Sequence, residues 1–275
     1  MCKCTKTSLL LCGAALAVCG GAVWLTAPGR SRRAQRAPFE GQNFAHRGLY
    51  NTGAGIPENS LAAFRAAAEQ GFGVELDTRL TADGYVVVSH DDALRRMTGA
   101  DQRVSELTLH ELQTLHLNGT EETVPLFSDV LDVLCAAAVP VIVEVKTCER
   151  YRELCRKTLS ILDEHSGSFC VESFDPRIVR WFRINAPEML RGQLTSQRDD
   201  LGEGAVKSYL VSRVLTNFFT RPQFIAHHVG KKSWGVKLCE ALGAMRVIWT
   251  AHDRSEEARC DAVIFEHFVP PVHFR

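Results

Sequence analysis

Charged side chains occur in pairs inside apolar runs of this sequence, at a spacing that could support chemistry. Glu75 and Asp77 are two residues apart, so on a β-strand their side chains would lie on the same face. Neighbouring carboxylates repel each other unless a proton or a cation lies between them. Glu144 and Lys146 repeat this spacing after a second apolar run. The pattern indicates a cation site where two strands end.

Each pair also has a simpler interpretation as an ion pair, Glu144 with Lys146 and Glu75 with Arg79. Three carboxylates at the ends of neighbouring strands nevertheless favour one shared cation, because active sites of α/β barrels lie at the carboxyl ends of the strands. Ligation by oxygen atoms alone favours Mg²⁺ or Ca²⁺ over zinc. We therefore expect Glu75, Asp77 and Glu144 to bind one Mg²⁺ or Ca²⁺ ion.

Two histidines, His46 and His90, lie on either side of the acidic pair in the sequence, each at the end of an apolar run. A single histidine in such a place is often only a hydrogen-bonded polar residue. Two histidines beside a metal and carboxylates can serve as general base and general acid. We expect this role for both.

Arg47 and Lys146 add positive charge where a phosphate group would bind. An arginine can hold two phosphate oxygens at once. Arg47 has an alternative use, a salt bridge to Glu75 or Glu144, and the two uses are compatible. Together these residues predict a metal-assisted site for phosphoryl chemistry.

The elements that must position these residues begin with a strand over 43–47, a helix over 60–70 with Asn59 as its N-cap, and a strand over 74–80. Strand, helix and strand form the unit of a parallel sheet. A turn at residues 81–84 then leads to a strand over 85–89, too soon for a crossover helix, so this strand folds back antiparallel. A turn centred between Asp83 and Gly84 pairs residues whose numbers sum to 167, which places His90 opposite Asp77.

Residues 92–124 are irregular and read as an insertion, with one helical piece over 107–115 capped by Ser105. Helices and strands then alternate. The expected helices cover 128–137, 149–164, 176–185, 205–217 and 233–242, and the expected strands cover 139–146, 169–173, 189–195, 223–227, 246–250 and 262–266. Without the hairpin strand, eight strands remain, the number that a TIM (β/α)8 barrel requires. The alternative is an open doubly wound sheet, but its glycine-rich dinucleotide turn is not found.

The N-terminal region differs from the rest of the chain. Residues 1–7 are short and basic, and residues 8–27 form a run of 20 uncharged residues, which as a helix would span roughly 30 Å, the thickness of a bilayer core. Residues 28–42 read as a linker, and 43–275 as one catalytic domain. We interpret 8–27 as an uncleaved transmembrane anchor.

Four arginines follow this run and two lysines precede it, which favours a cytoplasmic side for the catalytic domain. The six cysteines after residue 100 are spaced like reduced core residues. The formal net charge is zero, so nucleic acid is not an expected partner. The sequence contains no signal for a protein partner.

Five ordered motifs resemble those of the glycerophosphodiester phosphodiesterase (GDPD) family. They are His46-Arg47-Gly48, Pro57-Glu58-Asn59-Ser60, Glu75-Leu76-Asp77, Asp83-Gly84 with Val86 to Asp91, and Glu144-Val145-Lys146. The resemblance implies a TIM barrel with a small insertion after the His-Asp motif, and hydrolysis of small-molecule glycerophosphodiesters to an alcohol and glycerol 3-phosphate. It also implies a metal on Glu75, Asp77 and Glu144, an acid/base pair of His46 and His90, and the substrate's glycerol hydroxyl as nucleophile.

The C-terminal third departs from the family pattern. Residues 261–266 stand where many members have a Gly-Ile-Ile-Thr-Asp run, and 251–259 is short for a full helix. Phe174, Trp249, His227 and His228 are expected at the mouth beside the substrate, although a core role suits Phe174 and Trp249 equally well. Two other functions stay open: a lysophospholipase D-type hydrolysis of membrane lipids, which the anchor favours, and a catalytically silent membrane-bound binding module.

Overall fold

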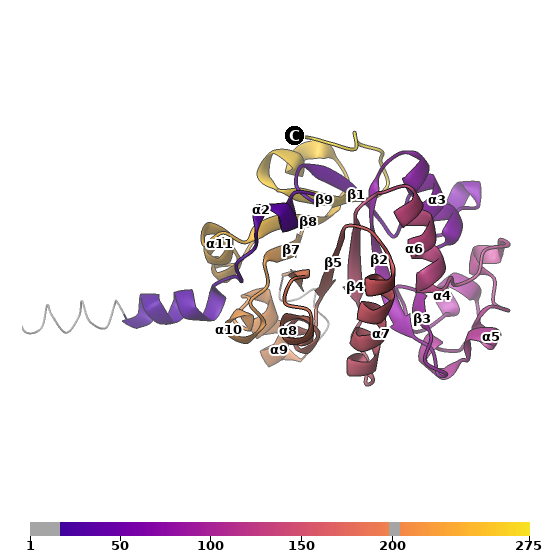
Figure 1. Cartoon of the computed structure of the whole chain (residues 1–275), viewed down its shortest axis with the longest axis horizontal. Helices are drawn as coiled ribbons and strands as arrows, with labels where there is room; N and C mark the ends of the chain where they lie inside the picture. The colour runs from indigo at the N-terminus through magenta and orange to yellow at the C-terminus, as the bar shows by residue number, and fades with distance from the viewer. Residues whose placement is uncertain (1–16, 198–203) are drawn as a thin grey trace, which may run out of the picture.

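The central strand is β2 (Gly73–Leu80), whose eight residues make it the longest of the sheet. In this computed structural model, which describes residues 17–197 and 204–275, β2 pairs in parallel with β1 (Gln42–His46) and with β4 (Val141–Val145). Within the described residues the strand order β1-β9-β8-β7-β6-β5-β4-β2, together with the β1–β2 pairing, closes a ring of eight parallel strands (Figure 1). The expected (β/α)8 barrel is confirmed.

The remaining strands and helices follow in regular alternation around this ring. The strands are β5 (Phe169–Ser173), β6 (Leu190–Thr195), β7 (Phe224–His228), β8 (Met245–Ala251) and β9 (Ala262–Phe265). The helices are α3 (Leu61–Glu69), α6 (Phe127–Ala136), α7 (Tyr151–Glu164), α8 (Pro176–Asn185), α9 (Ala205–Ser212), α10 (Asn217–Thr220) and α11 (Trp234–Ala241). The single helix expected over 205–217 is therefore two helices, and 251–259 contains only a 3₁₀ helix, Arg254–Arg259.

Aromatic and aliphatic side chains fill the barrel at the end where the strands begin. Phe44, Phe224 and Met245 belong to one buried cluster there, and Phe39 joins it from the segment before β1. Full burial of such a side chain contributes about 1.5–3 kcal/mol. Gly192 makes room for this packing, because a Cβ atom at that position would lie 2.0 Å from the Phe224 ring. This end of the barrel is a packed core.

The hairpin strand β3 (Val86–Val88) pairs antiparallel with β2, as expected, but in a different register. Thr78 is opposite Val88, so the paired numbers sum to 166 and the predicted register was wrong by one residue. The turn has three residues between Thr81 and Tyr85, with Gly84 at φ +88°, which suits a hairpin loop that ends in a left-handed residue. Ser89, and not His90, is therefore hydrogen-bonded to Asp77, through its backbone N–H at 2.9 Å.

The insertion after β3 is built from short helices around its own small core. It contains α4 (Arg95–Thr98), α5 (Leu109–Leu112) and two 3₁₀ turns. A buried cluster separate from the barrel core joins its apolar residues to Val87 of β3. Thr108 caps α5 in a reciprocal pair with Glu111, so the expected cap at Ser105 was wrong. The more favourable capping-box spacing decides the start of this helix.

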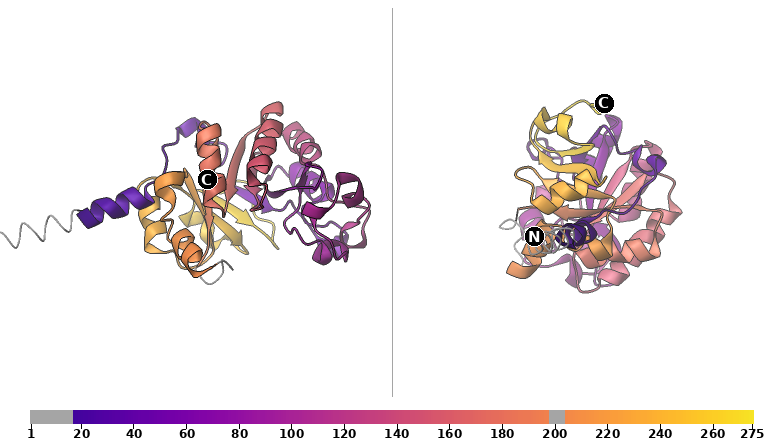
Figure 2. Two further views of the ribbon diagram at one scale, coloured as in Figure 1. Left: turned by 90° about the horizontal axis from the view of Figure 1, so that it is seen from below. Right: turned by 90° about the vertical axis from the view of Figure 1, so that its left-hand side faces the viewer.

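The N-terminal segment lies at the opposite end of the long axis from the insertion (Figures 1 and 2). Residues 8–16 of the expected anchor lie outside the described residues, and residues 17–26 are helical. Over 17–197 and 204–275, no helix combines the length and apolarity needed to cross a membrane. The expected linker carries a short helix, α2 (Arg33–Arg36), and its Phe39 is buried in the barrel.

The described cysteines are free. Of the six after residue 100, four are buried like the expected core residues, namely Cys155, Cys170, Cys239 and Cys260, whereas Cys135 and Cys148 are only partly buried.

Candidate active site

Three acidic side chains converge at the carboxyl ends of β2 and β4. Asp77 is directly opposite Glu144 in the parallel register, and Glu75 lies one inward-facing position before Asp77. The three residues are only 3%, 1% and 7% exposed for Glu75, Asp77 and Glu144. Each offers an oxygen atom within 4.8 Å of the others. The structure thus brings together the three expected metal ligands.

Lys146 partly balances this charge. Its Nζ atom lies 2.7 Å from Asp77 Oδ1 and 2.7 Å from Glu144 Oε2, so the ion pair of the simpler interpretation is present. Burial raises the pKa of Asp77, but the charges of Lys146, His90 and Arg47 outweigh it and hold that pKa well below its usual range. Burial, only partly offset by Lys146, raises the pKa of Glu144 to about 6.

The charge of Lys146 compensates Glu75 only in part. Burial, and then the charges of Asp77 and Glu144, raise its pKa well above the usual value. The other simple interpretation, an ion pair with Arg79, is wrong, because Arg79 donates to the His90 carbonyl at 2.9 and 2.6 Å. Lys146 pairs with only two of the three buried carboxylates, and Arg47 is shared with Glu58. The site therefore has a deficit of positive charge, and its set of oxygen donors fits a hard divalent cation.

His46 ends β1 and is oriented by a carboxylate from the last strand. Its Nδ1 lies 2.7 Å from Glu266 Oε2, and its Nε2 lies 3.9 Å from Glu75 Oε2. A carboxylate at Nδ1 fixes the proton there and leaves Nε2 as the reactive nitrogen. Burial lowers the pKa of His46 despite the hydrogen bond to Glu266, which favours the neutral ring.

His90 has the same arrangement on the other side of the site. Its Nδ1 lies 2.7 Å from Asp91 Oδ1, which again leaves Nε2 for other partners. Burial is the main reason that its pKa falls to about 4. The two expected acid/base residues therefore share a design in which one carboxylate orients each ring.

Arg47 is held by acidic neighbours in a left-handed backbone conformation, φ +56°. Its Nη1 lies 2.7 Å from Glu58 Oε1, and its Nε lies 3.5 Å from Asp77 Oδ2. The alternative salt bridge to Glu75 or Glu144 is replaced by these two contacts. A guanidinium has five N–H donors, so others are left for a phosphate oxygen.

Asn59 serves the site and does not cap the helix. Its Nδ2 donates to Asp77 Oδ2 at 2.8 Å, and Ser60 is the N-cap of α3, accepting from the backbone N–H of Ala63. The prediction of Asn59 as the cap was wrong by one residue. Asparagine and serine can both cap a helix. Because Asn59 is hydrogen-bonded to the buried Asp77 carboxylate, Ser60 caps α3.

Comparison with known proteins agrees with this geometry. The glycerophosphoryl diester phosphodiesterase family matches residues 46–267. The chain belongs to this family. A glycerophosphodiester phosphodiesterase of Caldanaerobacter subterraneus is 31% identical over 160 residues, which are 54% of this chain and 65% of that protein. A lysophospholipase D of Rattus norvegicus is 34% identical over 129 residues, 42% of this chain and 38% of that protein.

A solved structure shares the fold over most of the chain. An Oleispira antarctica phosphodiesterase in complex with the product sn-glycerol-3-phosphate superimposes with a TM-score of 0.68 at 26% identity, covering 84% of this chain and 94% of that chain. The chain spans less than two thirds of the length of the two curated relatives named above.

In this family member, a cavity of about 530 Å³ opens beside the catalytic candidates. His90, Glu144 and Lys146 line one part of it, and Phe174 and Trp249 line another. The two aromatic rings meet edge to face at 5.6 Å between centroids. Of the two expected histidines of β7, His228 lines the cavity, whereas His227 is buried and was wrongly placed at the mouth.

Several site residues were not assigned from the sequence of this GDPD family member. Glu58 and Asn59 lie within a quoted motif, but Glu58 received no role and Asn59 was expected only as a helix cap. Glu266 directly follows β9, and the rule that barrel sites gather after strands could have found it. Glu172, buried in β5, is a fourth carboxylate close enough to raise the pKa of Glu75. Its charge inside an apolar strand was the available signal.

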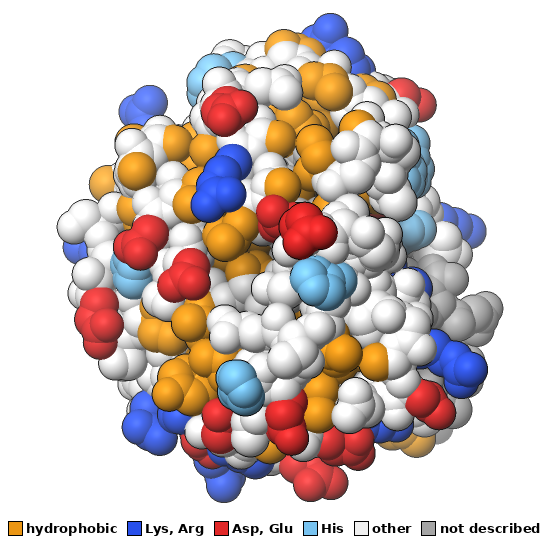
Figure 3. Space-filling model, turned by 90° about the vertical axis from the view of Figure 1, so that its right-hand side faces the viewer, with side chains coloured by type: hydrophobic (Ala, Val, Ile, Leu, Met, Phe, Trp, Pro, Cys, Tyr) orange, Lys and Arg blue, Asp and Glu red, His pale blue; other side chains and the backbone are white. Residues whose placement is uncertain are grey.

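Away from this site the surface charge is mixed. On the face at the right of Figure 1, acidic and basic side chains are interspersed (Figure 3). This agrees with the formal net charge of zero.

Proposed function

We propose that the protein hydrolyses glycerophosphodiesters to an alcohol and glycerol 3-phosphate. The observation that carries the proposal is the pair His46 and His90, each oriented at Nδ1 by a carboxylate, beside the three converging carboxylates. The solved relative with bound sn-glycerol-3-phosphate supports the choice of substrate class. Family membership supports the reaction type.

In this mechanism the two imidazoles carry the protons. The glycerol hydroxyl attacks phosphorus, the bond from phosphorus to the alcohol oxygen breaks, and a cyclic phosphodiester forms. One unprotonated Nε2 accepts the proton of the attacking hydroxyl, and the other imidazole, which enters the step protonated at Nε2, gives that proton to the leaving alcohol oxygen. Water then opens the cyclic phosphodiester to glycerol 3-phosphate with the two rings in exchanged roles, which restores both protonation states. Lys146 Nζ has three hydrogens and two carboxylate partners, which leaves one hydrogen for a phosphate oxygen. The guanidinium of Arg47 offers further donors. Phe174 and Trp249 contact the apolar part of the substrate.

Glu75, Asp77 and Glu144 would hold one Mg²⁺ or Ca²⁺ ion, which supplies positive charge against the phosphate and a template for the hydroxyl.

The test is release of glycerol 3-phosphate from glycerophosphocholine and glycerophosphoethanolamine, with and without EDTA. We expect EDTA to abolish release, and His46→Ala and His90→Ala to lower kcat by about 10²- to 10⁴-fold. His110→Ala, an exposed histidine of α5, is the matched control. Activity that survives EDTA or His46→Ala would overturn the mechanism. A folded protein whose melting temperature does not rise with Mg²⁺ or Ca²⁺ would favour a silent binding module.

A second candidate is lysophospholipase D-type hydrolysis at a membrane, with residues 8–27 as the anchor. The supporting observation is an exposed apolar surface next to the cavity. Tyr209 and Leu210 of α9 are exposed, and the next residue, Val211, lines the cavity. On α10, the Phe218 ring stacks on Trp24 of the N-terminal helix at 4.9 Å.

This candidate predicts faster choline release from lysophosphatidylcholine in vesicles than from soluble glycerophosphocholine. Leu210→Glu would slow only the vesicle reaction, because it places a charge on the membrane-facing surface without touching the site. Equal effects on both substrates would argue against it. Protease protection in sealed vesicles tests the expected cytoplasmic side of the catalytic domain.

A further inference from the structure

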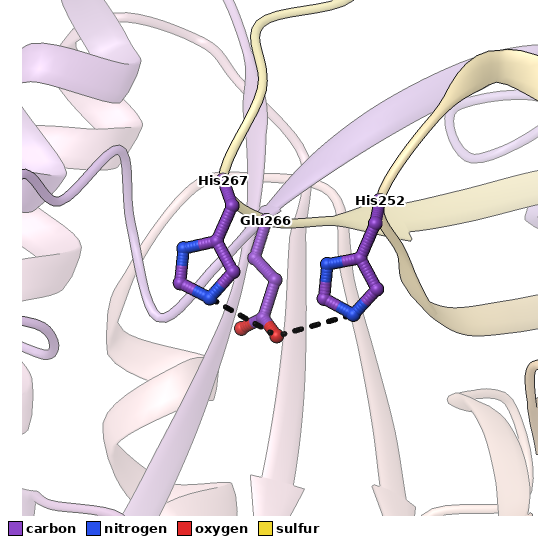
Figure 4. A group of neighbouring side chains, drawn as sticks. All are labelled: His252, Glu266 and His267. Atoms are coloured by element: carbon purple, nitrogen blue, oxygen red, sulfur yellow. Dashed lines mark ion pairs between the residues drawn. The ribbon is translucent and has the colours of Figure 1, made fainter.

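A second group of potential metal ligands lies beside the site, at the carboxyl ends of β8 and β9. His252 directly follows β8, and Glu266 and His267 directly follow β9. Glu266 Oε1 lies 3.8 Å from His252 Nε2 and 3.6 Å from His267 Nε2 (Figure 4). The ligand atoms of all three residues lie within 4.8 Å of one another.

The geometry of this group suits a small tetrahedral ion. Ligands about 2.1 Å from a tetrahedral metal lie roughly 3.4 Å apart, close to the two distances above. The imidazole rings are almost parallel, with 8° between planes and 5.6 Å between centroids. Figure 4 shows both rings and the carboxylate pointing to the same side. Small side-chain rotations would complete the site, because both histidines are exposed, 61% and 63%.

The backbone also favours this arrangement. Glu266 and His267 are consecutive, and consecutive side chains of a strand point to opposite faces. His267 has φ +64°, a left-handed conformation that is uncommon for residues other than glycine. With this conformation the two side chains lie on one side of the chain.

We propose that His252, Glu266 and His267 form a second metal site, selective for a late first-row ion such as Zn²⁺. Two imidazoles and one carboxylate are the ligand types that Zn²⁺ prefers, whereas Mg²⁺ and Ca²⁺ prefer oxygen ligands alone. The two sites therefore differ in their ion. The three protein ligands leave a fourth position for water.

Glu266 connects this second site to His46. Its Oε2 atom accepts from His46 Nδ1 at 2.7 Å and from Tyr50 Oη at 3.3 Å, while Oε1 faces His252 and His267. A cation on Oε1 draws negative charge away from Oε2 and weakens its hold on the His46 ring. Zn²⁺ bound here therefore lowers the turnover that depends on His46, and this regulatory part rests on the proposed function.

The binding test does not depend on activity. Zn²⁺ is titrated calorimetrically into the full chain in saturating Mg²⁺, which keeps the oxygen site occupied. We expect one Zn²⁺ per chain, an affinity at least about 10-fold weaker in His252→Ala or in His267→Ala, and no binding in the double variant. His110→Ala is the control and should bind like the wild type. Zn²⁺ binding that is undiminished in the double variant, or absent from the wild type, overturns the site.

The regulatory test measures kcat in saturating Mg²⁺ with increasing Zn²⁺. We expect a fall of about 10-fold for the wild type and for His110→Ala, and none for the double variant. Inhibition that persists in the double variant would place the effect at the oxygen site and overturn the regulatory role. If the protein has no phosphodiesterase activity, the proposed function fails, while the calorimetric result still decides the second site.

Discussion

The two ends of the barrel hold their charged groups in opposite ways. At the mouth, Glu75, Asp77 and Glu144 are buried together, and one lysine, Lys146, pairs with Asp77 and Glu144. At the other end, Asp261 lies between two arginines, 2.9 Å from Arg246 and 3.2 Å from Arg275. The paired charges stabilise the fold, whereas the clustered carboxylates oppose it. Such a destabilising cluster of charges is typical of a functional site, where the chemistry requires it.

Removal of a carboxylate at the mouth should have the largest effect on activity. We expect Glu144→Gln to lower kcat on the order of 10³-fold, because the loss of a metal ligand forfeits several kcal/mol of transition-state stabilisation. Without added metal its melting temperature should match or exceed that of the wild type, since one repelling charge is gone. Enzyme assays and thermal unfolding measure the two quantities, with Glu69→Gln, an exposed residue of α3, as control. A clearly lower melting temperature would contradict the contrast between the two ends.

Replacement of Glu266 tests whether activity at the mouth of the barrel depends on a residue that positions His46, in addition to the proposed metal ligands. In buffer that is freed of other metal ions and then supplemented with Mg²⁺, Glu266→Gln should lower kcat by about 10- to 100-fold with little change in KM. The amide weakens the control of the His46 ring without removing a substrate contact. Tyr50→Phe, which removes a longer hydrogen bond to the same carboxylate, should have a smaller effect. Parallel losses in kcat and in stability would instead indicate a structural role.

At the opposite end, the same kind of change should affect stability alone. Asp261 accepts from the Arg246 backbone N–H at 2.8 Å and from its side chain at 3.1 and 2.9 Å. Asp261→Asn should lower the free energy of unfolding by about 1–3 kcal/mol, with unchanged turnover per folded molecule. Urea unfolding measures this, and Asp163→Asn, exposed on α7, is the control. Reduced turnover in the folded variant would contradict the conclusion that charges at this end of the barrel affect stability alone.

The pH dependence of that stability gives the smallest and most specific effect. Burial raises the pKa of Asp261, but hydrogen bonds and charge from Arg246 outweigh it and lower the pKa from 3.8 to about 2. A depressed pKa stabilises the fold above the unfolded value, and this contribution is lost as the pH falls from about 4 to about 2. The stability difference between the wild type and Asp261→Asn should narrow over that interval. A difference independent of pH would exclude the carboxylate charge as its origin.

The barrel could be predicted from the sequence because its signals are local and repeated. Apolar runs of strand length alternate with helical runs, and β5 and α8 have the bounds that their residues indicate. The grouping of the carboxylates Glu75, Asp77 and Glu144 followed from a spacing of two residues and from the rule that parallel strands end together.

Other features depend on contacts between distant parts of the chain. The register of β3 depends on the exact number of residues in the turn before it, and the Asp83-Gly84 pair alone does not determine that number. Whether Asn59 or Ser60 caps α3 depends on a carboxylate 18 residues away in the chain. The bond between His46 and Glu266 joins residues 220 apart, and it exists only because the first and last strands meet when the barrel closes.

Arg96 connects the insertion to the active site. It lies in α4, yet its guanidinium contacts Glu58 at 2.7 Å and Asp91 at 2.6 Å. Glu58 holds Arg47, and Asp91 orients His90. A chimera that carries a relative's insertion would keep its fold, because the segment has its own core. Without an arginine at this place, however, it would lose the contacts that connect Arg47, the proposed phosphate-binding residue, to His90, one of the two proposed acid/base residues.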